Sequence, residues 1–192
     1  LQQLITTPCT RAQLLELLPK AAANLRKALE MGWLVEVPVT LAECASGAAL
    51  ATTPEQAAVI EALRASAKGF SASLLEGVTG SGKTEVYLQL AADAVARGEQ
   101  VLVLVPEIGL TPQLLARFKE RFGTGVASFH SGMSENERAD VWLRARESEA
   151  RIVIGTRSAV FVPFARLGLL VIDEEHDASF KQQDSFRYSA RD

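Results

Sequence analysis

A glycine-rich loop carries the clearest chemical signal in this 192-residue sequence. Residues 77–84 read GVTGSGKT and fit the pattern G-x-x-x-x-G-K-[ST] at every fixed position. Glycines let successive backbone N–H groups curl around a phosphate without Cβ clashes, and a helix that begins near Lys83 adds the positive end of its dipole. Lys83 would reach the β- and γ-phosphates, and the Thr84 hydroxyl would bind Mg²⁺. The predicted nucleotide-binding residues of the loop are Gly77, Val78, Thr79, Gly80, Ser81, Gly82, Lys83 and Thr84.

Two adjacent carboxylates would supply the hydrolytic half of such a site. Asp173 and Glu174 follow the apolar run 169–172, which predicts that they lie at the carboxyl end of a buried strand, where open α/β sheets bind ligands. Asp173 would hold Mg²⁺ through its water shell, and Glu174 would orient and polarise the attacking water. Together with Lys83 they are the predicted catalytic residues. A solvated acidic turn is the alternative interpretation of the carboxylates, as a flexible Gly/Ser turn is of the loop, and their joint presence argues against both.

Strands and helices that alternate along the chain would position these groups. From residue 53 onward, apolar runs alternate with capped segments of helical period. The predicted helices cover residues 53–67, 83–98, 110–123 and 134–148. The predicted strands cover residues 71–77, 100–106, 126–131, 150–156 and 167–175. Because such apolar strands are typical of burial on both faces, the predicted fold class is α/β, a P-loop NTPase (RecA-like) parallel sheet with helices on both faces.

The first 45 residues differ from the rest and predict a small winged-helix domain. Two short helices, 10–18 and 19–31, precede a short strand that begins at Trp33. The second helix could read DNA, but its basic residues are matched by acidic ones, which favours a scaffolding or docking role. The predicted domains are a winged helix at 1–45, a linker at 46–53 and an ATP-binding lobe at 54–192.

Composition sets further limits on the class of protein. The formal net charge of −3 argues against a protein that coats nucleic acid along its whole surface. Cys9 and Cys44 are far apart, which indicates reduced thiols in a cytoplasmic protein. No apolar run approaches the ~20 residues of a membrane span. The first residue is Leu1 and the sequence ends at YSARD, so we expect part of a longer chain.

The DEEH sequence at 173–176 resembles the D-E-x-H box of superfamily-2 helicases. Further stretches resemble the PriA family of bacterial replication-restart helicases (primosomal protein N′); they lie at 101–114, 129–138, 152–164 and 173–192. The resemblance covers the chain from Thr53 onward. It implies an ATP- and Mg²⁺-dependent 3′-to-5′ DNA helicase of replication-fork restart and primosome assembly. Its implied partners are single-stranded and forked DNA, single-stranded DNA-binding protein and other primosome proteins, with no membrane contact and a monomeric state.

The resemblance also assigns binding residues. Gln56 would read the adenine edge, since a carboxamide both donates and accepts hydrogen bonds; an ordinary glutamine at a helix start is the alternative. Thr111 would contact DNA or merely cap a helix, and the aromatic residues near the end of the chain would stack on bases or pack beneath their own lobe. His176 would couple the two sites or lie idle on the surface. The residues assigned to DNA binding or coupling are Gly109, Thr111, Thr156, Arg157, Ser158, His176, Phe180, Lys181, Phe186, Arg187 and Tyr188.

The family has parts that this sequence lacks. A strand bearing its third helicase motif, a zinc-binding insertion and a second helicase lobe would follow Asp192, and zinc is expected only there. That strand normally lies between the strand of the glycine loop and the strand of Asp173, so the sheet would be left open at this position or filled in another way. We therefore expect the chain alone to bind ATP weakly and to be inactive. The alternatives are another P-loop NTPase, such as a nucleotide kinase, and a non-hydrolysing DNA-binding or docking module.

Overall fold

The computed structural model describes residues 27, 31, 51–66, 69–78, 80–182 and 187–191. The chain divides into two units, Leu1–Thr40 and Leu41–Asp192, and nearly all described residues belong to the second. The predicted winged helix and most of the predicted linker lie outside the described residues and stay predictions.

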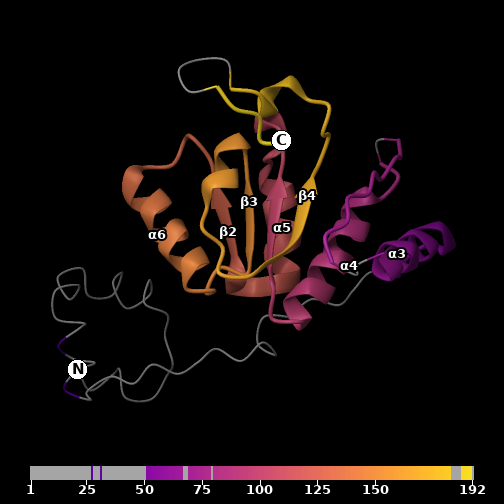
Figure 1. The fold of residues 1–192 in the computed structure, drawn as a ribbon, viewed down its shortest axis with the longest axis horizontal. Coiled ribbons are helices and arrows are strands. Elements are labelled where there is room, and N and C mark those ends of the chain that lie inside the picture. Colours follow the sequence, from indigo (N-terminus) through magenta and orange to yellow (C-terminus); the bar gives the residue numbers. More distant parts are fainter. Residues whose placement is uncertain are drawn as a thin grey trace. The chain divides into compact units, whose positions relative to one another are not determined.

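A parallel sheet of four strands forms the centre of the second unit. The strands are β1 (Gln100–Leu104), β2 (Val126–Phe129), β3 (Ile152–Gly155) and β4 (Leu167–Ile172). Their order is β2-β3-β1-β4, and all three pairings are parallel (Figure 1). Because successive side chains of a strand point to opposite faces, alternate residues of β1 enter two different cores.

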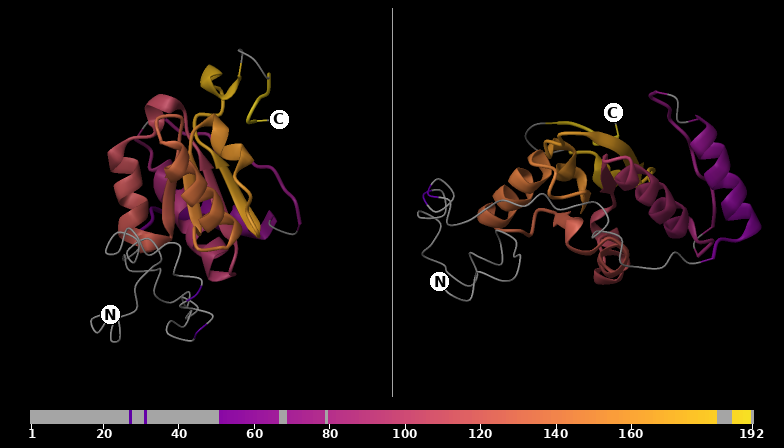
Figure 2. Two further views of the ribbon diagram at one scale, coloured as in Figure 1. Left: turned by 90° about the vertical axis from the view of Figure 1, so that its left-hand side faces the viewer. Right: turned by 90° about the horizontal axis from the view of Figure 1, so that it is seen from below.

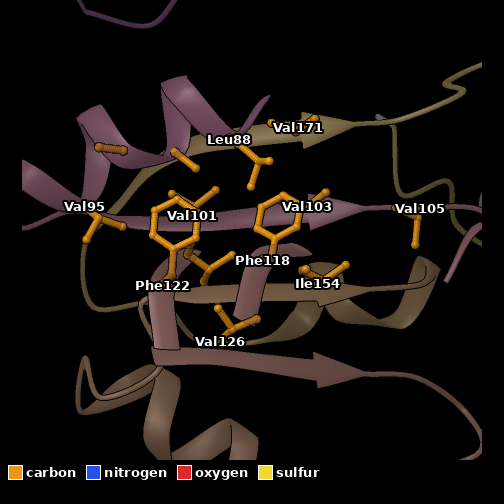
Figure 3. Close-up of a cluster of buried hydrophobic side chains, with 13 residues drawn as sticks. Leu88, Val95, Val101, Val103, Val105, Phe118, Phe122, Val126, Ile154 and Val171 are labelled. Carbon is orange, nitrogen blue, oxygen red and sulfur yellow. The ribbon is translucent and has the colours of Figure 1, made fainter. Parts of the chain in front are cut away.

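Helices cover both faces of this sheet, as predicted (Figure 2). On one face, α4 (Lys83–Ala96) and α5 (Pro112–Phe122) pack on Val101 and Val103, with the rings of Phe118 and Phe122 6.1 Å apart (Figure 3). On the other face, Leu102 and Leu104 meet residues of α6 (Glu135–Arg146) and of the 3-10 helix η5 (Arg157–Phe161). The predicted α/β fold with a parallel sheet is thus confirmed.

Helix α3 (Pro54–Ser66) lies outside these layers and packs on α4 (Figure 1). It buries Ile60, and Arg64 donates to both carboxylate oxygens of Asp93 on α4, at 2.7 and 3.0 Å. These contacts join the second half of α3 to α4. None of the helices in the described part of the chain has the length and apolar character to cross a membrane.

The predicted strand at 71–77 is wrong. Residues 71–78 form neither strand nor helix, and Leu74 is 70% exposed. A strand is stabilised by backbone hydrogen bonds to a neighbour. Among the described residues, the segment before the glycine loop has no such neighbour, because the sheet ends at β4 and the one pairing of β4 there is with β1. This matches the expectation that the position between these two segments would be open.

The last strand of the order is also less buried than its sequence predicts. Leu167 and Leu170 of β4 are each 46% exposed, whereas every residue of β1 is buried. An apolar run alone therefore did not distinguish an edge strand from a central one. The prediction of burial on both faces holds for β1 and β3 and fails for β4.

A buried amide joins the amino-terminal ends of the strands. The side chain of Gln100 is fully buried; its Nε2 donates to the carbonyl oxygens of Ala145 and Ala150, both at 2.8 Å, and its Oε1 accepts from the backbone N–H of Arg166 at 3.0 Å. Three separate segments are thereby fixed to the first residue of β1. A buried polar group that loses its partner costs about 1–3 kcal/mol.

We expect Gln100→Leu to lower the free energy of unfolding by about 3 kcal/mol, because leucine fills the space but satisfies none of the three backbone groups. Urea unfolding of the chain, followed by circular dichroism, measures this loss. Gln113→Leu, at an exposed position of α5, is the matched control and should change stability by less than about 0.5 kcal/mol. Equal stabilities of the two variants would contradict the role given to Gln100.

Candidate nucleotide site and DNA-facing segments

The glycine loop leaves the first turn of α4 without a side-chain cap. Gly80 and Gly82 both have a φ of 82°, a conformation that glycine adopts without strain. Gly82 is the N-cap of α4 and supplies no side-chain acceptor, whereas Thr111 and Ser134 cap α5 and α6 through their hydroxyl oxygens. The N–H groups at the start of α4 are therefore available to an anion. Thr79 lies outside the described residues.

Lys83 is folded back over this loop. Its ammonium group donates to the carbonyl oxygens of Gly77 and Val78, the latter at 3.3 Å. Thr84 follows it in the first turn of α4 and is half-buried. The loop therefore brings a cation, a hydroxyl group and the free N–H groups of a helix start together within eight residues. This is the combination that binds phosphate and Mg²⁺ in P-loop sites.

A tyrosine connects this helix to the acidic box, the DEEH sequence at residues 173–176. The hydroxyl of Tyr87, on α4, donates to Oδ1 of Asp173 at 3.1 Å, while the backbone N–H of Asp173 donates to the carbonyl of Leu104 at 2.9 Å. Burial, with the nearby carboxylates of Asp173 and Glu174, raises the pKa of Tyr87, so the phenol keeps its proton. Tyr87 was not among the predicted site residues, although its position one turn after Thr84 placed it on the same side of α4.

The acidic box itself is a tight turn with an unusual backbone. Glu174 has a φ of 49°, in the left-handed region that non-glycine residues rarely adopt, and its side chain is exposed. Its carbonyl accepts from the N–H of Asp177, and Oδ1 of Asp177 accepts from the N–H of Ser179 at 2.7 Å. The hydrogen bonds from Ser179 lower the pKa of Asp177. His176 is exposed on this turn.

Gln56 lies against the glycine loop. Its Nε2 contacts the carbonyl oxygens of Gly82 and Ser81, at 3.3 and 3.5 Å. Its Oε1 accepts from the N–H of Thr53 at 2.9 Å, and Oγ1 of Thr53 accepts from the N–H of Gln56 at 3.3 Å. This reciprocal pair is a capping box. The glutamine therefore has a structural role at the start of α3 and also reaches the loop, so its assignment to adenine stays a prediction.

The residues assigned to DNA contact divide into exposed and buried ones. Thr111 caps α5, since its Oγ1 accepts from the N–H of Leu114 at 3.2 Å; its own O–H remains available as a donor. Gly109 ends the 3-10 helix η3 (Glu107–Gly109), and Ser158 is half-buried. Thr156 is only 4% exposed, so it is poorly placed to meet a phosphate.

In the aromatic segment after the acidic box, the structure differs in part from the predicted base stacking. Phe180 is 1% exposed and belongs to the core cluster beneath α6 and η5, so its ring cannot stack on a base in this structure. Packing beneath its own lobe, the alternative interpretation, holds for this residue. Lys181 and Arg187 are exposed, and Tyr188 is half-buried. Phe186 lies outside the described residues.

The sequence motifs thus gather at the carboxyl ends of the strands. Lys83, Thr84 and Gln56 lie at or beside the glycine loop, and Tyr87 joins α4 to Asp173. The hydroxyl of Thr84 and the carboxylate of Asp173 are oxygen ligands of the kind that suit Mg²⁺, which also keeps water and phosphate oxygens in its shell. Within the described ranges, no group of three or more His, Cys, Asp or Glu side chains could hold a metal ion by itself.

Comparison with known families identifies the kind of protein. The model of the DEAD/DEAH box helicase family matches residues 53–192. The chain belongs to this family. Nucleotide and Mg²⁺ use is general among DEAD/DEAH box helicases, which agrees with the ligand set at the loop and at Asp173.

The chain is also similar to individual proteins of known name. The chain is 58% identical over 124 residues to replication restart protein PriA of Haemophilus influenzae, a match that covers 65% of this chain and 17% of that protein. It is 58% identical over 125 residues to the protein of that name from Synechocystis, covering 65% and 15%, and 49% identical over 145 residues to that from Bacillus subtilis, covering 74% and 18%. The chain therefore spans less than a fifth of the length of these relatives.

Proposed function

We propose that this chain is the ATP-binding lobe of a 3′-to-5′ DNA helicase that acts in replication-fork restart and primosome assembly. The Tyr87–Asp173 hydrogen bond carries the proposal, because it brings the acidic box to the helix that follows the phosphate loop. The similarity to proteins named for replication restart supports the choice of process, and polarity follows from the resemblance alone.

The roles of the chain's own residues follow from their positions. ATP with Mg²⁺ supplies the phosphoryl group that is transferred to water. The N–H groups at the start of α4 and the Lys83 ammonium would bind the phosphates, and Thr84 and Asp173 would hold the metal. Tyr87 would orient the carboxylate of Asp173, and exposed Glu174 would orient a water molecule and accept its proton.

The partners belong to the same proposal. Single-stranded and forked DNA would meet Gly109, Thr111, Ser158, Lys181, Arg187 and Tyr188, several of which are exposed or half-buried at the carboxyl ends of the strands. Single-stranded DNA-binding protein and other primosome proteins would be its protein partners, and the protein would act as a cytoplasmic monomer. Because residues 71–77 stand outside the sheet, we expect the chain by itself to bind ATP weakly and to unwind nothing.

Tyr87→Phe should weaken the Mg²⁺-dependent part of ATP binding by 10–100-fold, the usual cost of losing a group that orients a metal ligand. Titration of Mg²⁺ at a fixed concentration of a fluorescent ATP analogue measures this effect. Tyr188→Phe is the matched control, since it also removes one phenol hydroxyl and its ring meets Phe161 of η5, and it should leave the titration unchanged. Identical Mg²⁺ titrations of the two variants would rule out the orienting role.

Strand separation on a forked DNA substrate tests the proposed function directly. The full natural polypeptide should unwind the fork only when ATP and Mg²⁺ are present. A non-hydrolysing docking module predicts binding to the fork without ATP-dependent unwinding, and a nucleotide kinase predicts neither. Unwinding that did not require ATP, or none at all, would overturn the helicase proposal.

A further inference from the structure

After the acidic box, residues 180–182 and 187–190 pair with each other and form the base of a hairpin. Lys181 and Ser189 form an antiparallel bridge, the N–H of Gln182 donates to the carbonyl of Tyr188 at 2.8 Å, and the N–H of Ala190 donates to the carbonyl of Phe180 at 3.0 Å. Phe180 and Ala190 are both buried in the core cluster beneath α6 and η5. The two ends of the hairpin are therefore fixed to the lobe.

Arg157, the first residue of η5, holds one strand of this hairpin. Its Nη1 donates to the carbonyl oxygens of Ser179 and Lys181, both at 3.0 Å. One Nη1 nitrogen has two N–H groups, so both are used within the protein. These carbonyls flank buried Phe180, so Arg157 is hydrogen-bonded to the chain where it enters the hairpin.

Phe161, the last residue of η5, holds the other strand. Its ring and that of Tyr188 lie edge to face, with centroids 4.9 Å apart and planes at 65°. Such aromatic pairs contribute beyond the area that they bury. The first and last residues of η5 thus contact both strands of the hairpin, one strand by hydrogen bonds and the other by a ring contact.

The base of the hairpin is also connected to the acidic box. Nη1 of Arg191 pairs with Oε2 of Glu175 at 2.6 Å, and Asp177 accepts from the N–H of Ser179. A displacement of the hairpin would therefore act on the turn that holds Asp173 and Glu174. The contacts form a continuous path from η5 through the hairpin to the acidic box.

We propose that Arg157 and Phe161 latch the hairpin base, residues 180–182 and 187–190, to η5, and that Arg157 is a positioning residue and not a ligand of DNA phosphate. The two segments then move as one unit. This inference rests on the proposed function only for its consequence in DNA binding, because the latch itself is an internal contact of the chain.

Hydrogen exchange of the chain without DNA tests the latch. Arg157→Ala should speed exchange of the Gln182 and Ala190 amides by at least about tenfold, because both amides donate within the hairpin base. Arg157→Lys should restore slow exchange, since an ammonium can donate to both carbonyls. Lys181→Ala is the control; it keeps the backbone carbonyl and should leave both amides protected. Unchanged protection in Arg157→Ala would overturn the latch, and Phe161→Ala gives the same readout if the first variant fails to fold.

The salt dependence of single-stranded DNA binding by the full natural polypeptide tests the positioning role. Arg157→Ala should weaken binding with an unchanged slope of log K against log salt concentration. Lys181→Ala, which removes an exposed cation, should reduce that slope by about 1. A slope reduced by about 1 in Arg157→Ala would make Arg157 a phosphate ligand and contradict the inference. If the unsubstituted protein bound no DNA, the proposed function would fail, and the exchange data would still decide on the latch.

Discussion

Lys83→Ala is expected to reduce ATP hydrolysis by the full natural polypeptide by about 10²–10³-fold, the usual cost of removing a group that stabilises transition-state charge. The ammonium group lies over the loop carbonyls of Gly77 and Val78, and no other cation of the loop could replace it. Phosphate release at saturating ATP measures the rate, and a fluorescent ATP analogue measures binding.

Glu174→Gln separates catalysis from binding at the same site. The amide keeps the shape of the side chain but cannot accept the proton of water, so turnover should fall by about 10²–10⁴-fold while ATP binding is retained. Glu135→Gln is the matched control, because this carboxylate is exposed in the first turn of α6, outside the acidic box. If both glutamine variants hydrolysed ATP at the same rate, Glu174 would not be the residue that activates water.

Glu85→Ala is expected to lower the free energy of unfolding by about 3–5 kcal/mol. Oε1 of Glu85, on α4, lies 2.7 Å from Nη1 of Arg121 on α5, and the two side chains are only 11% and 10% exposed. The alanine variant leaves a buried guanidinium without its counter-charge. Since whole domains are stable by about 5–15 kcal/mol, such a loss would bring the lobe close to unfolding.

The control for this prediction is an exposed ion pair between α3 and α4, the helix that carries Glu85. Asp93→Ala breaks the contact with Arg64. The side chain of Asp93 is 30% exposed and that of Arg64 is 45% exposed, so the free energy of unfolding should fall by at most about 1 kcal/mol. Urea unfolding of both variants gives the comparison. A double variant, Glu85→Gln with Arg121→Met, should recover much of the stability because it removes both buried charges. Equal losses from Glu85→Ala and Asp93→Ala would show that the Glu85–Arg121 pair is not buried in solution.

Structural features that depend on residues close together in the sequence were predicted well. The glycine loop, the start of α4 and the helix cap at Thr111 are local patterns; α4 begins at Lys83 as predicted, and α5 begins at Pro112, two residues after its predicted start. Strands β1 to β4 were found from their apolar runs. Residues 71–77 were also predicted as a strand and form none, because a strand requires a partner that the segment itself does not specify.

Within the site, the side chains hardest to assign from the sequence are those whose contacts lie far away along the chain. The spacing of Phe180 and Tyr188 among basic residues suited base stacking, but one ring is buried in the core and the other meets Phe161. Arg157 had the chemistry of a phosphate ligand, and only its distance to the Ser179 and Lys181 carbonyls indicates another use. Tyr87 could not be assigned because Asp173 is 86 residues away along the chain.

ATP hydrolysis by the full natural polypeptide, with and without single-stranded DNA, tests the central claim most directly. We expect a low rate without DNA, a marked increase on addition of DNA, and no increase in either Lys83→Ala or Glu174→Gln. A rate that did not respond to DNA, or a stimulated rate that survived both substitutions, would contradict the claim that this lobe hydrolyses ATP to act on DNA.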